Sequence, residues 1–326
     1  MDSSLAVFIV LGSSIIGLVY FYLVWNFNYW KSRNVNGPKP TILFGNLPSL
    51  VRKHRNYNFE VSEIYEKFKK TGDRFIGIFM TRNPVVLLLD PLLARDILTN
   101  KFKSFSNNEL SLWGNRKTEK VSIHHPFITR TDEDWKERRN DFIAGISDSK
   151  LQQTYPILTQ INHRMTNFIN TEIVKTGGII EIESLSYKYV VDFVANFVYG
   201  IDANVFTSGI PTNPMYNHSR NLMDLSFKQI EQFYLLGLVP CLKKIVKDRF
   251  FDQDTDNYFI DMQKIAIDMR LKNKNDRFDF LNYVLKLQEK KNLSNMDVVV
   301  HSMSVVLDAV DTTAFVILHT LFLVRY

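Results

Sequence analysis

Cysteine is almost absent from this sequence, because the 326 residues contain a single one, Cys241. One cysteine excludes a disulfide framework, an iron–sulfur cluster and a zinc site built from several thiolates. It also fits a reducing compartment. Glycine and proline are scarce, with 13 and 10 residues against 25 phenylalanines and 14 tyrosines. This composition excludes disorder, low complexity and collagen-like repeats, and it supplies enough apolar residues for a large core.

Several enzyme signatures are missing as well. No G-x-G-x-x-G or G-x-x-x-x-G-K-[ST] stretch occurs, so the nucleotide-binding fingerprints are absent. There is no H-E-x-x-H or G-x-S-x-G, and the adjacent His124 and His125, followed by Pro126, fit a loop better than a metal site. The 40 Lys and Arg exceed the 34 Asp and Glu by only six. This mild excess indicates an anionic membrane surface or an acidic partner more readily than nucleic acid.

The sequence does contain a long uncharged run of 21 residues, Leu5 to Trp25. As a helix it would span about 30 Å, the hydrocarbon thickness of a bilayer. A cleaved signal peptide is the alternative, but the start is acidic at Asp2 and the run is long. Aromatic residues and then Lys31 and Arg33 follow the run, which places that side in the cytosol. We predict three parts: a transmembrane anchor over 1–30, a basic, proline-rich linker over 31–50 and a body over 51–326.

The body has the pattern of a mainly helical protein with a small β-sheet. Apolar residues recur at helical spacing in most segments, and two short apolar runs flank a turn. Strands are predicted over 74–80 and 84–90, with the turn at Arg82 and Asn83. Helices are predicted over 57–70, 92–99, 151–174, 182–199, 219–236, 254–271 and 278–289.

The last segment, 295–326, contains neither glycine nor proline and is predicted as one long helix. Ser294 and Asp297 have the spacing of a capping box at its start. A second membrane span would place two aspartates at mid-bilayer, so we predict a buried core helix instead. Asp308, Asp311 and Thr312 share one stripe of this helix. They are either functional, or form a solvated notch or a hydrogen bond to the preceding turn, and the spacing does not decide between these.

Several motifs occur together in the order and spacing of one known family. Together they resemble the microsomal cytochrome P450 monooxygenases, most closely the insect xenobiotic-metabolising branch. The resemblance implies the P450 fold, incomplete here. The motifs are Gly37-Pro38-Lys39-Pro40 with Phe44-Gly45-Asn46 after the anchor, Trp135 to Arg139 as W-x-x-x-R, Arg277 to Leu281, and Asp308 to Thr313 as [AG]-G-x-[DE]-T-T.

The resemblance implies a role for each matching residue. Trp135 and Arg139 would bind a haem propionate, because an indole N–H and a forked guanidinium suit a carboxylate. The alternative for this segment is an exposed helix with an ordinary charged face. Asp311 and Thr312 would be the acid–alcohol pair that supplies protons for dioxygen activation. Ala309 stands beside the haem where the family has glycine, and Asp308 where it has a small residue, which would alter substrate class or slow oxygen activation.

One expected element is missing from the sequence. The family ligates haem iron with a cysteine in F-x-x-G-x-x-x-C-x-G, and neither this motif nor the preceding E-x-x-R occurs. Cys241 lies far upstream, and we predict that it is a small buried side chain. The sequence ends within the last predicted helix, which is the expectation for an amino-terminal fragment or a truncated product. No metal ligand is therefore predicted.

Three functions remain open from the sequence. The resemblance implies a haem-thiolate monooxygenase that inserts one oxygen atom from O2 into a lipophilic xenobiotic, hormone or lipid. It would face the cytosol from the endoplasmic reticulum membrane, contact membrane lipids and receive electrons from NADPH through NADPH–cytochrome P450 reductase. One alternative is a non-catalytic, membrane-anchored fragment that cannot ligate haem iron. The other is a membrane-tethered carrier of apolar ligands.

Overall fold

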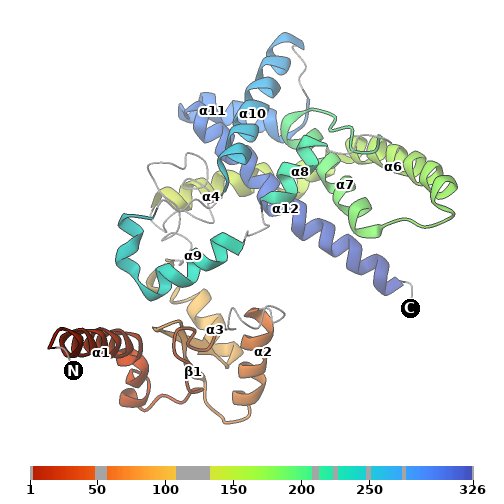
Figure 1. Cartoon of the computed structure of the whole chain (residues 1–326). Coiled ribbons are helices and arrows are strands. Elements are labelled where there is room, and N and C mark those ends of the chain that lie inside the picture. The colour runs from red at the N-terminus through yellow and green to blue at the C-terminus, as the bar shows by residue number, and fades with distance from the viewer. Residues whose placement is uncertain are drawn as a thin grey trace. The chain divides into compact units, whose positions relative to one another are not determined.

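The part of the chain that the computed structural model describes is mainly helical with one two-stranded sheet, as predicted (Figure 1). The chain divides into two compact units, of which unit 1 is Met1–Ser106 with Phe227–Val246 and unit 2 is Asn107–Ser226 with Lys247–Tyr326. The residues that the structure describes are 3–47, 57–107, 133–207, 213–222, 227–246, 251–273 and 277–324. The predicted His124–His125 loop lies outside them.

Unit 1 begins with the apolar run, which forms α1 and is exposed along its length. Two described helices, α1 and α12 of unit 2, are long and apolar enough to cross a membrane by length and composition alone. The other elements of unit 1 follow in chain order. Their bounds are α1 (Ser3–Val24), η1 (Trp25–Asn28), η2 (Lys31–Arg33), α2 (Tyr57–Phe68), β1 (Phe75–Met80), β2 (Asn83–Leu88), α3 (Pro91–Leu98), η3 (Phe102–Ser104), α9 (Phe227–Leu238) and η7 (Pro240–Lys244).

The predicted hairpin is present as an antiparallel pair of β1 and β2, with Ile76 opposite Leu87. Ile76, Ile78 and Leu89 form a small core that packs against α2. The turn lies at Thr81 and Arg82, one residue before the predicted position. Thr81 takes a left-handed φ of 57°, and the next residue after Arg82 already pairs with Met80.

The end of α1 contacts the hairpin and α9. The Tyr22 hydroxyl donates to the Leu238 carbonyl at 3.0 Å, and the Asn83 amide donates to the Gly237 carbonyl at 3.1 Å. The Arg82 guanidinium lies 3.7 Å from the centroid of the Tyr22 ring, a cation–π contact. The apolar helix is therefore joined to folded structure at its end.

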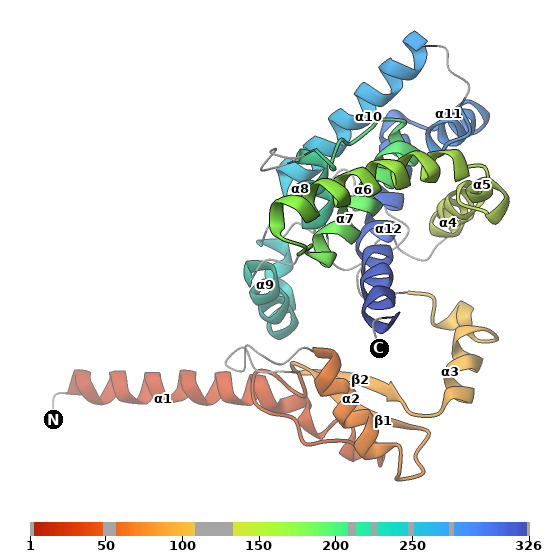
Figure 2. The same cartoon turned by 90° about the vertical axis from the view of Figure 1, so that its right-hand side faces the viewer.

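Unit 2 contains the remaining helices (Figure 2). The predicted helix 151–174 is two helices, because α5 ends at Gln152 and a new helix begins at Tyr155, with Pro156 in its first turn. The predicted helix 219–236 is also two, α8 in unit 2 and α9 in unit 1. The bounds are α4 (Glu133–Gly145), α5 (Asp148–Gln152), α6 (Tyr155–Thr176), α7 (Ile182–Val194) continued by the π-helix η6 (Ala195–Tyr199), α8 (Pro214–Asn221), α10 (Gln253–Asn273), α11 (Phe280–Lys291) and α12 (Asn295–Val324).

The first half of α12 forms the centre of the unit 2 core. Every residue from Val298 to Leu307 is buried, and α7, α10 and α11 pack around them. From Phe315 onward most of the helix is exposed. The prediction of a buried core helix is therefore confirmed for the first half of α12 and is wrong for the second.

Two ion pairs with a buried aspartate connect helices of unit 2. Asp192 is fully buried, and Arg164 of α6 lies 2.8 Å from it. Burial raises the pKa of Asp192, an effect that Arg164 partly offsets. A second pair, Arg270 with Asp279, joins α10 to the start of α11 at 2.5 Å. Buried charges of this kind need their partners, so these pairs fix how α6, α7, α10 and α11 meet.

Candidate functional site

The predicted stripe of α12 lies where the burial of that helix ends. Asp308 and Asp311 are half-buried, whereas Thr312 is exposed. Ala309 is half-buried and packs against the core of unit 2. The polar residues therefore lie at the margin of the core, within reach of solvent. At this position they can exchange protons with solvent.

Asp308 has a perturbed pKa. Burial raises its pKa to about 6, and Arg139 of α4 acts in the opposite direction. The two side chains are therefore close enough to interact electrostatically. The helices that carry the two predicted site segments, α4 and α12, are in contact although they are far apart in the sequence, because Arg138 lies 2.8 Å from Asp297.

Asp311 faces α7. Its Oδ1 accepts a hydrogen bond from the Tyr187 hydroxyl at 2.6 Å. Burial raises the pKa of Tyr187, and the bond to Asp311 raises it further. We did not predict Tyr187 from the sequence. The available signal was its spacing of three and four residues from Val190 and Val191, which places it on the buried face of α7.

Thr312 makes a local hydrogen bond. Its hydroxyl donates to the carbonyl of Asp308 at 2.5 Å, one turn earlier in the helix. This is the alternative that the sequence left open for such a residue. The Thr312 oxygen still has acceptor capacity, and its hydroxyl can rotate.

On α4, Trp135 is half-buried and Arg139 is exposed. The Arg139 guanidinium lies 5.7 Å from the centroid of the Trp135 ring, as the spacing of four residues predicts. Within the described residues Arg139 makes no hydrogen bond and no ion pair of 4 Å or less. An indole and an exposed guanidinium side by side can receive a carboxylate.

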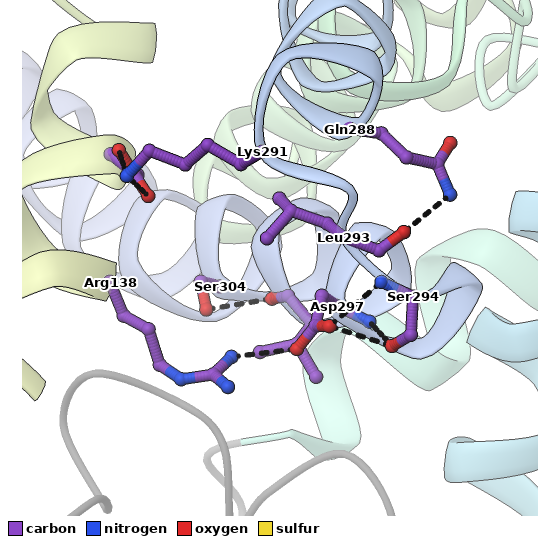
Figure 3. A network of polar contacts seen from close by, with 9 residues as sticks. Arg138, Gln288, Lys291, Leu293, Ser294, Asp297 and Ser304 are labelled. Carbon is purple, nitrogen blue, oxygen red and sulfur yellow. Dashed lines mark hydrogen bonds and ion pairs between the residues drawn. The ribbon is translucent and has the colours of Figure 1, made fainter. Parts of the chain in front are cut away.

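The neighbouring Arg138 has a different position. Its Nη1 lies 2.8 Å from Oδ1 of Asp297, and both side chains are about four-fifths buried. The other oxygen of Asp297 accepts from the amide of Ser294 at 3.0 Å and from its hydroxyl at 2.6 Å (Figure 3). The Asp297 amide donates back to the Ser294 hydroxyl at 3.2 Å, so the predicted capping box is confirmed.

A second set of ion pairs joins α4 to the end of α11, just before α12 begins. Lys291, at the end of α11, lies 2.8 Å from Glu137 and 2.8 Å from Asp141, both on α4. We define Arg138, Asp297, Ser294, Lys291 and Asp141 as the α4 brace. The α4 brace fixes α4 to the end of α11 and to the start of α12.

Cys241 is exposed in η7 of unit 1. The prediction of a small buried side chain is therefore wrong. Its segment follows Pro240, and a short 3₁₀-helix has too few residues to enclose a side chain from all directions. Burial of a cysteine depends on what packs over it, and the local sequence does not contain that information.

The sequence of this chain is similar to one family throughout. The sequence model of the cytochrome P450 family matches residues 35–325. The chain is 32% identical to the probable cytochrome P450 28a5 of Drosophila melanogaster, covering 96% of this chain and 62% of that protein. The probable cytochrome P450 28d1 of the same fly is also 32% identical, covering 99% and 64%. Cytochrome P450 6B1 of Papilio polyxenes is 27% identical, covering 85% and 52%.

The chain thus spans between 52% and 64% of the length of these three relatives. The matched region contains both motif segments, W-x-x-x-R on α4 and the polar stripe on α12. This chain belongs to the cytochrome P450 family, and insect members of that family are among its relatives.

Proposed function

We propose that the whole protein is a haem-thiolate monooxygenase. It inserts one atom of O2 into a lipophilic substrate such as a xenobiotic, hormone or lipid, while the other atom leaves as water. The observation that carries this proposal is that α4, which bears Trp135 and Arg139, is joined through the Arg138–Asp297 ion pair to α12, which bears the half-buried acidic stripe. NADPH supplies the electrons through NADPH–cytochrome P450 reductase.

The donor set on α4 fits one end of a haem. Arg139 has an exposed guanidinium beside the Trp135 indole, and this pair would hold a propionate. The half-buried Ala309 would line the haem face of α12. Haem, when bound, supplies the activation of dioxygen. The thiolate ligand is not found in these 326 residues, since Cys241 is exposed in unit 1 and lacks the ligand motif.

Asp311 and Thr312 are proposed to move the protons that the reaction consumes. The Asp311 carboxylate can accept and release a proton while it accepts a hydrogen bond from the Tyr187 hydroxyl. Rotation of the Thr312 hydroxyl away from the Asp308 carbonyl would turn its donor toward the reacting oxygen. A half-buried acid and an exposed alcohol, one residue apart, can connect solvent to a site beside α12.

The location of the protein is part of the proposal. The exposed, apolar α1 would cross the endoplasmic reticulum membrane once and contact its lipids. Lys31 and Arg33 would place the remainder in the cytosol. We propose the anchor over 1–30, the linker over 31–50 and part of the catalytic domain over 51–326.

A carbon-monoxide difference spectrum tests the proposal. The protein is expressed from its complete coding sequence in microsomes that contain the reductase. We expect a thiolate-type Soret band after reduction, together with NADPH-dependent oxidation of lipophilic test substrates. Arg139→Ala should lower the haem content, whereas Asn140→Ala, the next residue and also exposed, should not. A protein without the band would contradict the proposal.

A second candidate concerns residues 1–326 alone. The exposed Cys241 and the exposed apolar side chains of the second half of α12 favour a membrane-anchored polypeptide that does not ligate haem iron. Exposed apolar side chains that lie together on a protein surface promote association with other molecules. Expression of exactly these residues, followed by the same spectrum, tests it. A thiolate-type band from this polypeptide would overturn the second candidate.

A further inference from the structure

The hydroxyl of Tyr187 is a feature that neither family motif includes. It donates to Asp311 at 2.6 Å, across the interface between α7 and α12. That interface is part of the core of unit 2, since Val190, Val191 and Val194 of α7 are all buried. The bond therefore joins two elements whose backbones are held in place by the core.

The ring of Tyr187 is held from its other side by α8. The Arg220 guanidinium lies 4.8 Å from the ring centroid, and the Tyr216 ring meets it edge-on at 6.4 Å. Arg220 also donates to the Tyr216 hydroxyl at 3.1 Å and pairs with Glu183 of α7. Contacts with α8 thus restrict the Tyr187 ring, while its hydroxyl bonds to α12.

A phenol that donates to a carboxylate does two things. It favours the ionised form of the acid, because the hydrogen bond is stronger to a charged acceptor. It also fixes the direction of the carboxylate, here toward α7. Asp311 and Thr312 are consecutive, so their side chains leave α12 in directions about 100° apart. The hydrogen bond from Tyr187 directs the Asp311 carboxylate toward α7.

We propose that Tyr187 is the positioning residue for Asp311, holding its carboxylate ionised and directed toward α7. The catalytic consequence rests on the proposed function, in which Asp311 moves protons. The charged groups near this pair are Arg220 and Glu183 on the α8 side, and Asp308 with Arg139 on the α4 side. Tyr187 acts through Asp311 and does not itself contact the reacting atoms.

The first test needs no cofactor. Infrared difference spectra between the wild-type chain and Asp311→Asn identify the carboxyl band of Asp311, and a pH titration of that band gives its pKa. We expect Tyr187→Phe to raise the pKa of Asp311, since it removes one donor and leaves the ring. The matched control is Tyr189→Phe, because Tyr189 is also half-buried on α7 and its hydroxyl makes no hydrogen bond within the described residues. An unchanged titration in Tyr187→Phe would overturn the proposal.

The second test measures the fraction of NADPH electrons recovered in oxidised product. We expect Tyr187→Phe to lower this fraction about tenfold at unchanged haem content, since a hydrogen bond to a charged group is lost. In an Asp311→Asn background the same change should have no further effect. An additional loss in that background would mean that Tyr187 acts elsewhere, and would overturn the proposal.

The two tests separate this inference from the proposed function. A changed titration without any substrate oxidation would retain Tyr187 as the partner of Asp311 and reject the monooxygenase. Oxidation with an unchanged titration would retain the monooxygenase and reject Tyr187 as the positioning residue.

Discussion

The two halves of α12 have similar apolar composition but different surroundings. From Val298 to Leu307 every side chain is buried, including those of His301, Ser302 and Ser304. From Phe315 onward, apolar residues such as Val316 and Leu323 are more than 60% exposed. The helix has no break between the halves. Hydrophobicity therefore predicts that a helix can be buried, and the neighbouring helices decide which part of it is.

The polar residues of the two halves differ in the same way. In the first half, the Ser304 hydroxyl donates to the Val300 carbonyl inside the core, and burial lowers the pKa of His301. At the start of the second half, Asp308, Asp311 and Thr312 stand where the continuous burial of the helix ends. Residues with access to solvent and to a packed scaffold suit chemistry, whereas fully enclosed ones suit stability.

The largest expected effect comes from placing a charge in each half. Val306→Asp should lower the free energy of unfolding by about 4 kcal/mol or more, since Val306 is fully buried and a new carboxylate there has no partner. Val316→Asp should change it by about 0.5 kcal/mol or less. Urea denaturation of the detergent-solubilised chain measures both. Equal costs would contradict the difference between the halves.

The next effect concerns the two adjacent arginines that meet α12. Arg138→Ala should cost about 2 kcal/mol, because it leaves the largely buried Asp297 without its ion pair at the start of the first half. Arg139→Ala should cost about 0.5 kcal/mol or less, since its side chain is exposed. The same denaturation measures the difference. If Arg139→Ala were the more costly change, the α4 brace would be assigned to the wrong arginine.

The third prediction is a pH dependence at the boundary between the halves. The pKa of Asp308 is raised from 3.8 to about 6 by burial, so between these values the folded chain binds more protons than the unfolded one. Its contribution to stability therefore falls as the pH rises from about 4 to about 6 and stays low above that.

Asp308→Asn removes this titration. The variant should match the wild type near pH 4 and exceed it by about 1–2 kcal/mol near pH 8, a value reduced for the partial exposure of the side chain. Denaturation midpoints across this range give the difference. A constant offset between the two proteins would show that Asp308 is not buried in solution.

The smallest effect compares one hydroxyl in each region. Ser294→Ala removes the cap of the first half and should cost about 1 kcal/mol. Thr312→Ala removes only a bond to the preceding turn and should change the free energy of unfolding by about 0.5 kcal/mol or less. Both are measured by urea denaturation. A large loss in Thr312→Ala would mean that its hydroxyl contributes to folding.

Much of the local structure was predictable from the sequence. Apolar periodicity identified the hairpin, α2, α7, α10, α11 and α12, and the Ser294–Asp297 spacing identified the cap. The errors lie where one continuous apolar pattern covers two helices. Pro156 lies in the first turn of α6, which is separate from α5. The range 219–236 contains parts of α8 and α9, which belong to different units. Periodicity continues across such breaks, because each helix presents an apolar face to its own core.

The site was predictable only in part. Trp135, Arg139, Asp308, Ala309, Asp311 and Thr312 were identified from motifs, and their roles in the P450 reaction remain predictions. Tyr187 and Arg138 were missed. The local sequence around each residue does not indicate which distant side chain it will contact. Their partners, Asp311 and Asp297, are 124 and 159 residues away. Side-chain pairs of this separation form only after the helices pack.

The sequence by itself determined the family, the helical class, the cap of α12 and the scarcity of cysteine, because these follow from residue identity and spacing along the chain. Only the tertiary structure decided that Cys241 is exposed, that α12 is buried for half its length, and that Arg138 pairs with Asp297. Exposure, pKa and ion pairing depend on what the other helices place around a residue. The sequence thus shows that the chain has a single cysteine, and the fold shows that the side chain of this cysteine is exposed.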